Sequence, residues 1–312
     1  MPRTASLALV CAALATLSSL CPAQEPDRAA AAGELQLLAS VVVANRSIDG
    51  HRPVELSALA FDRDQRELYA ASDRGVLFRL ALQWQAGRLL GATAAAAWPL
   101  RHPVDGSALD VEALAWRPAW SEGDAELLVA PEFGATAFRL DIATRSIATL
   151  AWPRGAAPAA ERSTSSRHGV EALDWHPVHG SIVVMQRPAA GAPMQHEAHA
   201  RDGSHWRWPA LAEGADIKAL EVVSPQRALV LERVRDRSAG RNSFYLRSID
   251  LTRCAAAASR SCEPANWRVP LPDKGSYNLE GLACLDESQC LLVSDSGNSS
   301  RRPTLLLHVR VP

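Results

Sequence analysis

Five glutamates recur along the chain, each at or just before the start of a short apolar run. They are Glu55, Glu112, Glu171, Glu221 and Glu280, at spacings of 57, 59, 50 and 59 residues. Such a period is typical of an architecture assembled from copies of one supersecondary unit. If the repeat brings the carboxylates together, they form an all-oxygen ring of the kind that a hard cation such as Ca²⁺ prefers. We therefore expect these five glutamates to be metal ligands.

The residues after each glutamate predict four short strands per repeat. A second apolar run ends in polar residues, as in LYAASDRG, LLVAPEFG, IVVMQRPA, LVLERVRD and LLVSDSGN. A third run follows in four of the five repeats, and a fourth run closes on tryptophan. Four strands separated by turn residues are typical of one blade of a β-propeller.

The last repeat ends after three strands, at the C-terminus. The segment Leu35–Val43 reads LQLLASVVV and is available as the missing strand. Pairing it with the last blade closes the ring and removes two exposed sheet edges. We expect an all-β propeller of five four-stranded blades, with a sixth left open should Gly155–His168 or Ser238–Ala265 hold further strands.

Propeller geometry gathers polar residues on one face of the disc. The first strand of a blade begins where the antiparallel second strand ends, so the residues at these two ends share a face. We predict that three carboxylates there are catalytic and that three arginines bind substrate: Asp73, Glu132 and Asp295, and Arg74, Arg187 and Arg233. A planar guanidinium suits phosphate oxygens.

A structural role for the repeated glutamates stays open. Two carboxylates about 6 Å apart repel by about 3 kcal/mol at an effective dielectric near 20. The ring therefore needs protonation, arginine partners, backbone amides or a cation. If each glutamate accepts hydrogen bonds from backbone N–H groups of the next blade, its role is to hold the two blades together.

Composition and the N-terminus indicate an exported protein. The formal net charge of −1 over 312 residues predicts no nucleic-acid partner. Arg3, the apolar run Leu7–Leu20 and Ala23 read as a signal peptide over residues 1–23, ahead of a flexible segment 24–33 and one propeller domain over 34–312. No later run is long enough to span a membrane. We expect a periplasmic or secreted monomer.

Four cysteines remain after cleavage of this leader. Cys254 and Cys262 form one close pair, and Cys284 and Cys290 form another. An oxidising compartment favours local disulfides between them, each contributing about 2 kcal/mol on the chain-entropy estimate. Their spacing does not suit zinc.

Several segments together resemble a known family. ELSALAFDRDQRELYAASDRG, DVEALAWRP with LLVAPEFGATAFRLD, ALEVVSPQRALVLERV with YLRSIDL, and NLEGLACLDESQCLLVSDSGN are similar to the phytase-like esterase domain of secreted and periplasmic bacterial proteins. The resemblance implies a propeller and a phosphoesterase or esterase activity. It falls on Glu55, Asp73, Arg74, Glu112, Glu132, Glu221, Glu232, Arg233, Glu280 and Asp295. The third repeat departs from it, with Gln186-Arg187 in place of an acidic residue.

Three functions follow as hypotheses. The first is a Ca²⁺-dependent phosphoesterase or esterase acting on a small (phospho)ester at the channel mouth. The second is a non-catalytic propeller that binds a ligand or a protein on that face. The third is a calcium-dependent lactonase. No organic cofactor is expected, because the chain has no phosphate-binding loop or dinucleotide fingerprint.

Overall fold

Short antiparallel strands make up the fold. The computed structural model describes residues 34–119, 123–132, 137–150, 170–187, 195–236, 241–255, 262–272, 277–297 and 302–312, with the backbone alone at 185–187 and 236. The predicted signal peptide 1–23, the segment 24–33 and the connection Gly155–His168 lie outside the described residues.

The described strands group into five four-stranded units, here called blades one to five. Blade one comprises β2 (Leu56–Asp62), β3 (Glu67–Ser72), β4 (Val76–Gln85) and β5 (Arg88–Pro99). Blade two comprises β6 (Val111–Arg117), β7 (Glu126–Pro131), β8 (Ala137–Asp141) and β9 (Ile147–Leu150). Blade three comprises β10 (Ala172–His176), β11 (Gly180–Arg187), β12 (Gln195–Ala200) and β13 (His205–Pro209). Blade four comprises β14 (Asp216–Ser224), β15 (Arg227–Asp236), β16 (Arg241–Asp250) and β17 (Ala265–Arg268). Blade five comprises β18 (Asn278–Cys284), β19 (Gln289–Asp295), β20 (Leu305–Arg310) and the N-terminal strand β1 (Gln36–Ala44).

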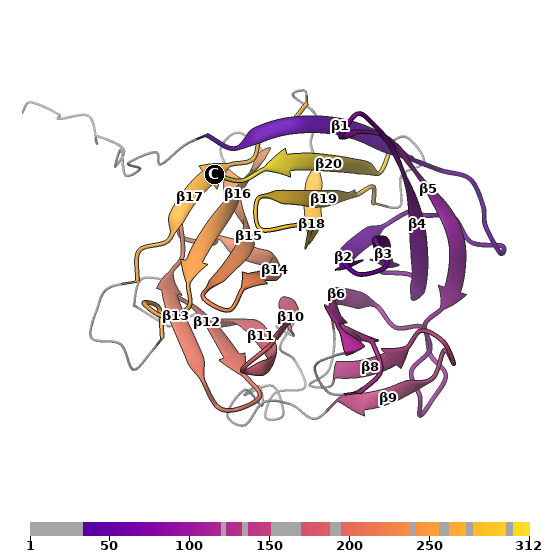
Figure 1. The fold of residues 1–312 in the computed structure, drawn as a ribbon, viewed down its shortest axis with the longest axis horizontal. Coiled ribbons are helices and arrows are strands. Elements are labelled where there is room, and N and C mark those ends of the chain that lie inside the picture. Colours follow the sequence, from indigo (N-terminus) through magenta and orange to yellow (C-terminus); the bar gives the residue numbers. More distant parts are fainter. Residues whose placement is uncertain are drawn as a thin grey trace, which may run out of the picture. The chain divides into compact units, whose positions relative to one another are not determined.

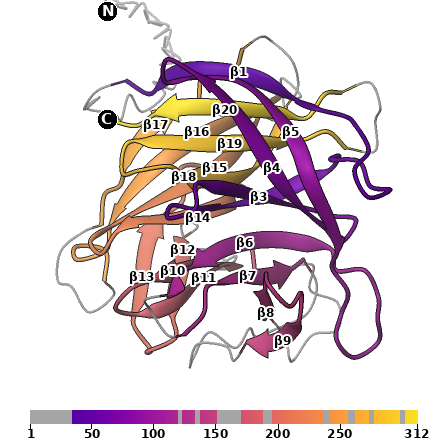
Figure 2. The same cartoon turned by 45° about the vertical axis from the view of Figure 1, so that its right-hand side comes forward.

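Strand β1 joins the two ends of the chain. It pairs antiparallel with β20, from Gln36 opposite Arg310 to Val42 opposite Leu305. It also makes a short parallel pairing with β5, so blades five and one form one eight-stranded sheet. Figure 2 shows β1 beside β20, and the sheet continues from β1 through β5 to β4. The N-terminal strand thus completes blade five as the sequence predicts.

The five inner strands surround a central axis. Each of β2, β6, β10, β14 and β18 contacts the next in this order, and β18 contacts β2 again (Figure 1). Five apolar clusters lie between consecutive blades, including one between blades five and one. The prediction of an all-β propeller is confirmed.

Small side chains line the inner strands because backbones approach closely around the axis. Ala58, Ala60, Ala113 and Ala172 are all buried there. A Cβ atom added to Gly281 would lie 2.7 Å from Cγ1 of Val293 and 3.0 Å from the backbone carbon of Ala58. Glycine is therefore required where blade five meets blade one.

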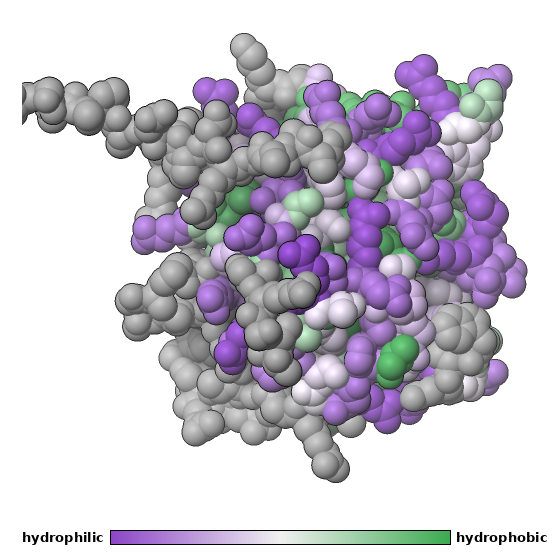
Figure 3. Space-filling model, turned by 60° about the vertical axis from the view of Figure 1, so that its left-hand side comes forward, coloured by the Kyte–Doolittle hydropathy of each residue, from purple (hydrophilic) through white to green (hydrophobic). Residues whose placement is uncertain are grey.

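The outer surface carries few large apolar side chains. The exposed ones among the described residues are Val42, Trp84, Leu90, Val104 and Val178. On the face drawn in Figure 3 the described side chains are mostly hydrophilic, with isolated apolar ones between them. Within the described part of the chain, no helix has the length and apolarity to cross a membrane.

Candidate functional site at the channel mouth

One residue near the start of each inner strand bulges from the sheet. The register of β2, β6, β14 and β18 skips one residue, and in blade three Glu171 and Ala172 both face Val184. A bulge leaves the extra residue without a ladder partner and redirects its side chain. The five residues at this position, called the bulge ring below, are Ser57, Glu112, Glu171, Lys218 and Glu280. The end of the propeller axis at which they lie is called the channel mouth, or the mouth.

Two of the five predicted glutamates lie outside the bulge ring. Glu55 lies two residues before the ring member Ser57, in a left-handed conformation with φ of 52°. Its N–H donates to Oγ of Ser296 at 3.2 Å, which joins blade one to blade five. Glu221 lies three residues beyond Lys218, deeper along β14. The five glutamates expected as metal ligands therefore do not all lie in one ring.

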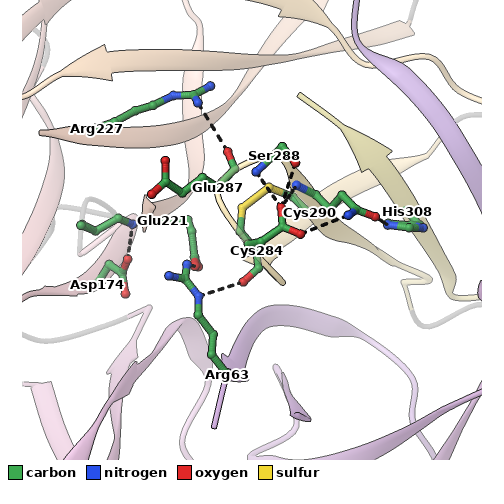
Figure 4. Close-up of a disulfide and its surroundings, with 12 residues drawn as sticks. Arg63, Asp174, Glu221, Arg227, Cys284, Glu287, Ser288, Cys290 and His308 are labelled. Atoms are coloured by element: carbon green, nitrogen blue, oxygen red, sulfur yellow. Dashed lines mark hydrogen bonds and ion pairs between the residues drawn. A yellow bond between two sulfur atoms is a disulfide. The ribbon is translucent and has the colours of Figure 1, made fainter. Parts of the chain in front are cut away.

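Glu221 belongs to a second charged cluster at the opposite end of the inner strands. It accepts a hydrogen bond from Arg63, which follows the end of β2, at 3.0 Å. Arg63 also donates to the carbonyl of Cys284 at 3.3 Å, beside the disulfide to Cys290 (Figure 4). Burial, with Asp174 nearby, raises the pKa of Glu221. This cluster links blades one, four and five away from the channel mouth.

Lys218 lies between carboxylates of the bulge ring. Its Nζ lies 3.1 Å from Glu112 and 3.3 Å from Glu280, and its side chain is 6% exposed. Burial alone lowers the pKa of Lys218, but the carboxylates of Glu280 and Glu112 outweigh it and raise that pKa overall. The ammonium is therefore charged and fixed between blades two and five.

A chain of hydrogen bonds extends from blade four to Glu280. Arg233 forms an ion pair with Asp216 at 2.6 Å and donates to Oδ1 of Asn278 at 2.7 Å. The amide of Asn278 in turn donates to Oε1 of Glu280 at 2.7 Å. These bonds fix the Glu280 side chain, which also contacts Lys218.

Three carboxylates converge where blades one and five meet, and one of them, Glu280, is also a member of the bulge ring. Asp73, Glu280 and Asp295 each offer an oxygen within 4.8 Å of the others, and are called the acidic triad below. Oδ1 of Asp73 is buried and has no hydrogen-bond partner among the described residues. Burial, with Glu280 and Asp295 nearby, raises the pKa of Asp73 to about 8. Ionising all three carboxyl groups together is energetically costly unless a cation binds between them.

A carboxyl pair in blade two lies near the acidic triad. Glu132 donates a side-chain hydrogen bond to Asp110, and burial together with Glu112 and Asp110 raises the pKa of Glu132 to about 7. Asp110 also contributes to the raised pKa of Asp73. Sequence reasoning missed Asp110, although it lies two residues before Glu112, as Glu55 does before Ser57.

The predicted arginines have different environments. Arg74 forms an ion pair with Glu55, and its side chain is 51% exposed. Arg233 takes the place in blade four that Asp73 takes in blade one, and it is nearly buried. The side chain of Arg187 lies outside the described residues. Of Arg74 and Arg233, Arg74 is therefore the more accessible to a ligand.

Glu232, which the family resemblance included, lies away from the mouth. It is fully buried, pairs with Arg247, and lies 3.1 Å from Nε2 of His196. The N–H of Leu211 donates to it at 2.7 Å. Despite its burial, these partners hold the pKa of Glu232 below its ordinary value. It is therefore a structural carboxylate between blades three and four.

Both predicted disulfides are present. Cys254 pairs with Cys262, and Cys284 pairs with Cys290 across β18 and β19.

Comparison with known proteins identifies the family. The phytase-like family, described as having the esterase-like activity of phytase, matches residues 54–297. The chain belongs to the phytase-like family. The match spans every inner strand and the acidic triad, so the resemblance noted in the sequence is confirmed.

Solved structures give distant matches to this phytase-like chain. Streptogramin B lyase is 9% identical, with 89% of this chain and 87% of that chain covered and a TM-score of 0.41. The β-propeller domain of Cps50 (Swd1) from Myceliophteria thermophila is 12% identical, with a TM-score of 0.36; the match covers 79% of this chain and 64% of that domain. U3-55K is 11% identical, with 88% and 98% covered and a TM-score of 0.37. No curated protein matches the chain.

Proposed function

We propose that this phytase-like propeller is a Ca²⁺-dependent hydrolase of small phosphate or carboxylic esters, acting at the channel mouth. The acidic triad of Asp73, Glu280 and Asp295 is the observation that carries the proposal. The family match supports an esterase-like role. A fold by itself hosts many functions, so the residues of the site decide between them.

The donor set of the acidic triad fits a hard divalent cation. It consists of carboxylate oxygens, which Ca²⁺ prefers, and Oδ1 of Asp73 lacks any partner among the described residues. A divalent cation held there polarises an ester oxygen and lowers the pKa of a bound water. Asp73, Glu280 and Asp295 would hold it, with Glu280 kept in place by Asn278.

Glu132 is suited to move a proton in the reaction. A carboxyl whose pKa is near 7 exists in both protonation states at neutral pH, as a general acid or base requires. The carboxylate of Asp110 accepts a hydrogen bond from the protonated Glu132 and so holds the Glu132 side chain in place. Asp73 and Asp295, which we predicted as catalytic, serve in this proposal as cation ligands.

The substrate anion is expected on the exposed cations of the mouth. The side chains of Arg74 and Arg235 are 51% and 55% exposed, whereas Lys218 and Arg233 are nearly buried in ion pairs. A planar guanidinium binds phosphate or carboxylate oxygens through two hydrogen bonds, and an exposed one is accessible to a ligand from solution. Arg74 is therefore the strongest candidate for substrate binding.

Export is part of the proposal. Two disulfides suit an oxidising compartment such as the periplasm or the extracellular medium. The leader predicted over residues 1–23 supports the same destination.

The test is hydrolysis by the purified chain of p-nitrophenyl phosphate, p-nitrophenyl acetate and a simple γ-lactone. Each substrate is assayed with Ca²⁺ and with EGTA. We expect turnover of an ester with Ca²⁺, its loss in EGTA, and at least a hundredfold lower kcat in Glu132→Gln, because general acid–base catalysis contributes about 10²–10⁴-fold. Glu67→Gln is the matched control, since Glu67 pairs with Arg79 at the other end of its blade. Absence of turnover on all three substrates with Ca²⁺ would refute a hydrolase.

A non-catalytic ligand-binding propeller is the second candidate. The ion pairs of Lys218 and Arg233 within the mouth favour it, because they leave few unpaired groups for chemistry. In that case Ca²⁺ binds and raises the melting temperature, but none of the substrates is turned over. Turnover of the lactone alone would instead identify a lactonase.

A further inference from the structure

Lys218 takes the place of a carboxylate in the bulge ring. Blades two, three and five each supply a glutamate at this position, blade one supplies Ser57, and blade four supplies the lysine. A carboxylate in blade four would have made the ring all-oxygen, which is the arrangement that hard cations prefer. The lysine replaces that ligand with a covalently attached positive charge.

The ammonium of Lys218 neutralises the ring from within. It contacts Glu112 from blade two at 3.1 Å and Glu280 from blade five at 3.3 Å. Blades two and five thus share one cation from blade four.

There is also little free space near the axis. Glu112, Lys218 and Glu280 line a cavity of only about 10 Å³, together with small and apolar residues of the inner strands. A cavity of this size holds about one water molecule. With the lysine in place there is little room for a metal ion and its ligands.

We infer that Lys218 is a built-in counter-cation that fills the axial cation position of the mouth and so keeps a divalent cation out of the bulge ring. Lys218 is therefore a specificity-determining residue that sets how many cations bind and where. The inference rests on the contacts of Lys218 and goes beyond the proposed hydrolysis.

The experiment measures Ca²⁺ bound per chain by isothermal titration calorimetry and equilibrium dialysis. The wild type is compared with Lys218→Met, Lys218→Arg and Lys218→Met combined with Glu112→Gln and Glu171→Gln. We expect Lys218→Met to bind one more Ca²⁺ than the wild type. Lys218→Arg keeps the wild-type number, and the combined variant loses the additional ion. Arg79→Met is the matched control, because it removes a carboxylate-paired cation far from the axis.

The outcomes separate this inference from the proposed function. No Ca²⁺ on the wild type and one on Lys218→Met supports the inference and contradicts the proposed metal dependence. Equal numbers on the wild type and Lys218→Met overturn the inference and leave the hydrolase proposal standing. If Lys218→Met folds only when Ca²⁺ is present, the ion has replaced the ammonium, which also supports the inference. Failure to fold with and without Ca²⁺ overturns it.

Discussion

Asp73→Asn should stabilise the protein when no divalent cation is bound. The pKa of Asp73 rises from its ordinary 3.8 to about 8 in the folded chain, mainly through burial. The folded state therefore binds more protons than the unfolded state between these values, so stability falls as the pH rises through this window. At about 1.4 kcal/mol for each pH unit, ionising Asp73 costs at most about 6 kcal/mol. Asparagine removes the charge and keeps the shape.

Thermal melts in EGTA at pH 5 and pH 8.5 test this expectation. We expect Asp73→Asn to melt slightly higher than the wild type at pH 5, which lies only a little above the ordinary pKa of 3.8, and much higher at pH 8.5, where the full penalty applies. The gain should be several degrees, since 1 kcal/mol corresponds to roughly 2 °C in a large domain. Adding Ca²⁺ at pH 8.5 should raise the melting temperature of the wild type more than that of the variant. If the variant melts lower than the wild type in EGTA at pH 8.5, ionisation of Asp73 does not destabilise the folded chain and the reasoning is refuted.

Three further predictions concern groups away from the mouth. Arg247→Met leaves Glu232 buried with its main counter-charge lost, so urea unfolding should show a loss of about 3–5 kcal/mol; a loss under 1 kcal/mol would show that Glu232 does not need Arg247. Replacing both Cys284 and Cys290 by serine opens a short loop and should cost about 2 kcal/mol on the entropy estimate, and an unchanged urea midpoint would contradict this. Because burial raises the pKa of Glu221, its contribution to stability falls as the pH rises above its ordinary value, and Glu221→Gln should flatten the profile of melting temperature against pH. A profile as steep as that of the wild type would disprove it.

The fold was predictable because blade architecture leaves a periodic record. The glutamate motif, the second strand and the closing tryptophan recur, and the C-terminal shortage of one strand points to Leu35–Val43. Close spacing likewise predicts the Cys284–Cys290 pair, which joins neighbouring strands of one hairpin. These features depend on local sequence and on the need to close a sheet.

The site was only partly predictable because register is not visible in a motif. In blade four the letters ALE, which end in Glu221, resemble the glutamate motif of the other repeats. The bulge nevertheless falls at Lys218 and not at Glu221. The turn after β14 has two residues, Pro225 and Gln226, whereas the turn after β2 has four. The second strand of blade four is displaced accordingly, so that Arg233 replaces a carboxylate and Glu232 turns into the core. A bulge follows from packing around the axis, which the sequence does not display.

We propose above that the acidic triad of this phytase-like propeller holds a divalent cation. Its most direct test is anomalous diffraction from crystals of the full chain soaked in Mn²⁺, a hard cation that Asp and Glu oxygens also bind. We expect one strong peak among Asp73, Glu280 and Asp295. A peak on the axis among Glu112, Glu171 and Lys218, or no peak at the mouth, would contradict it.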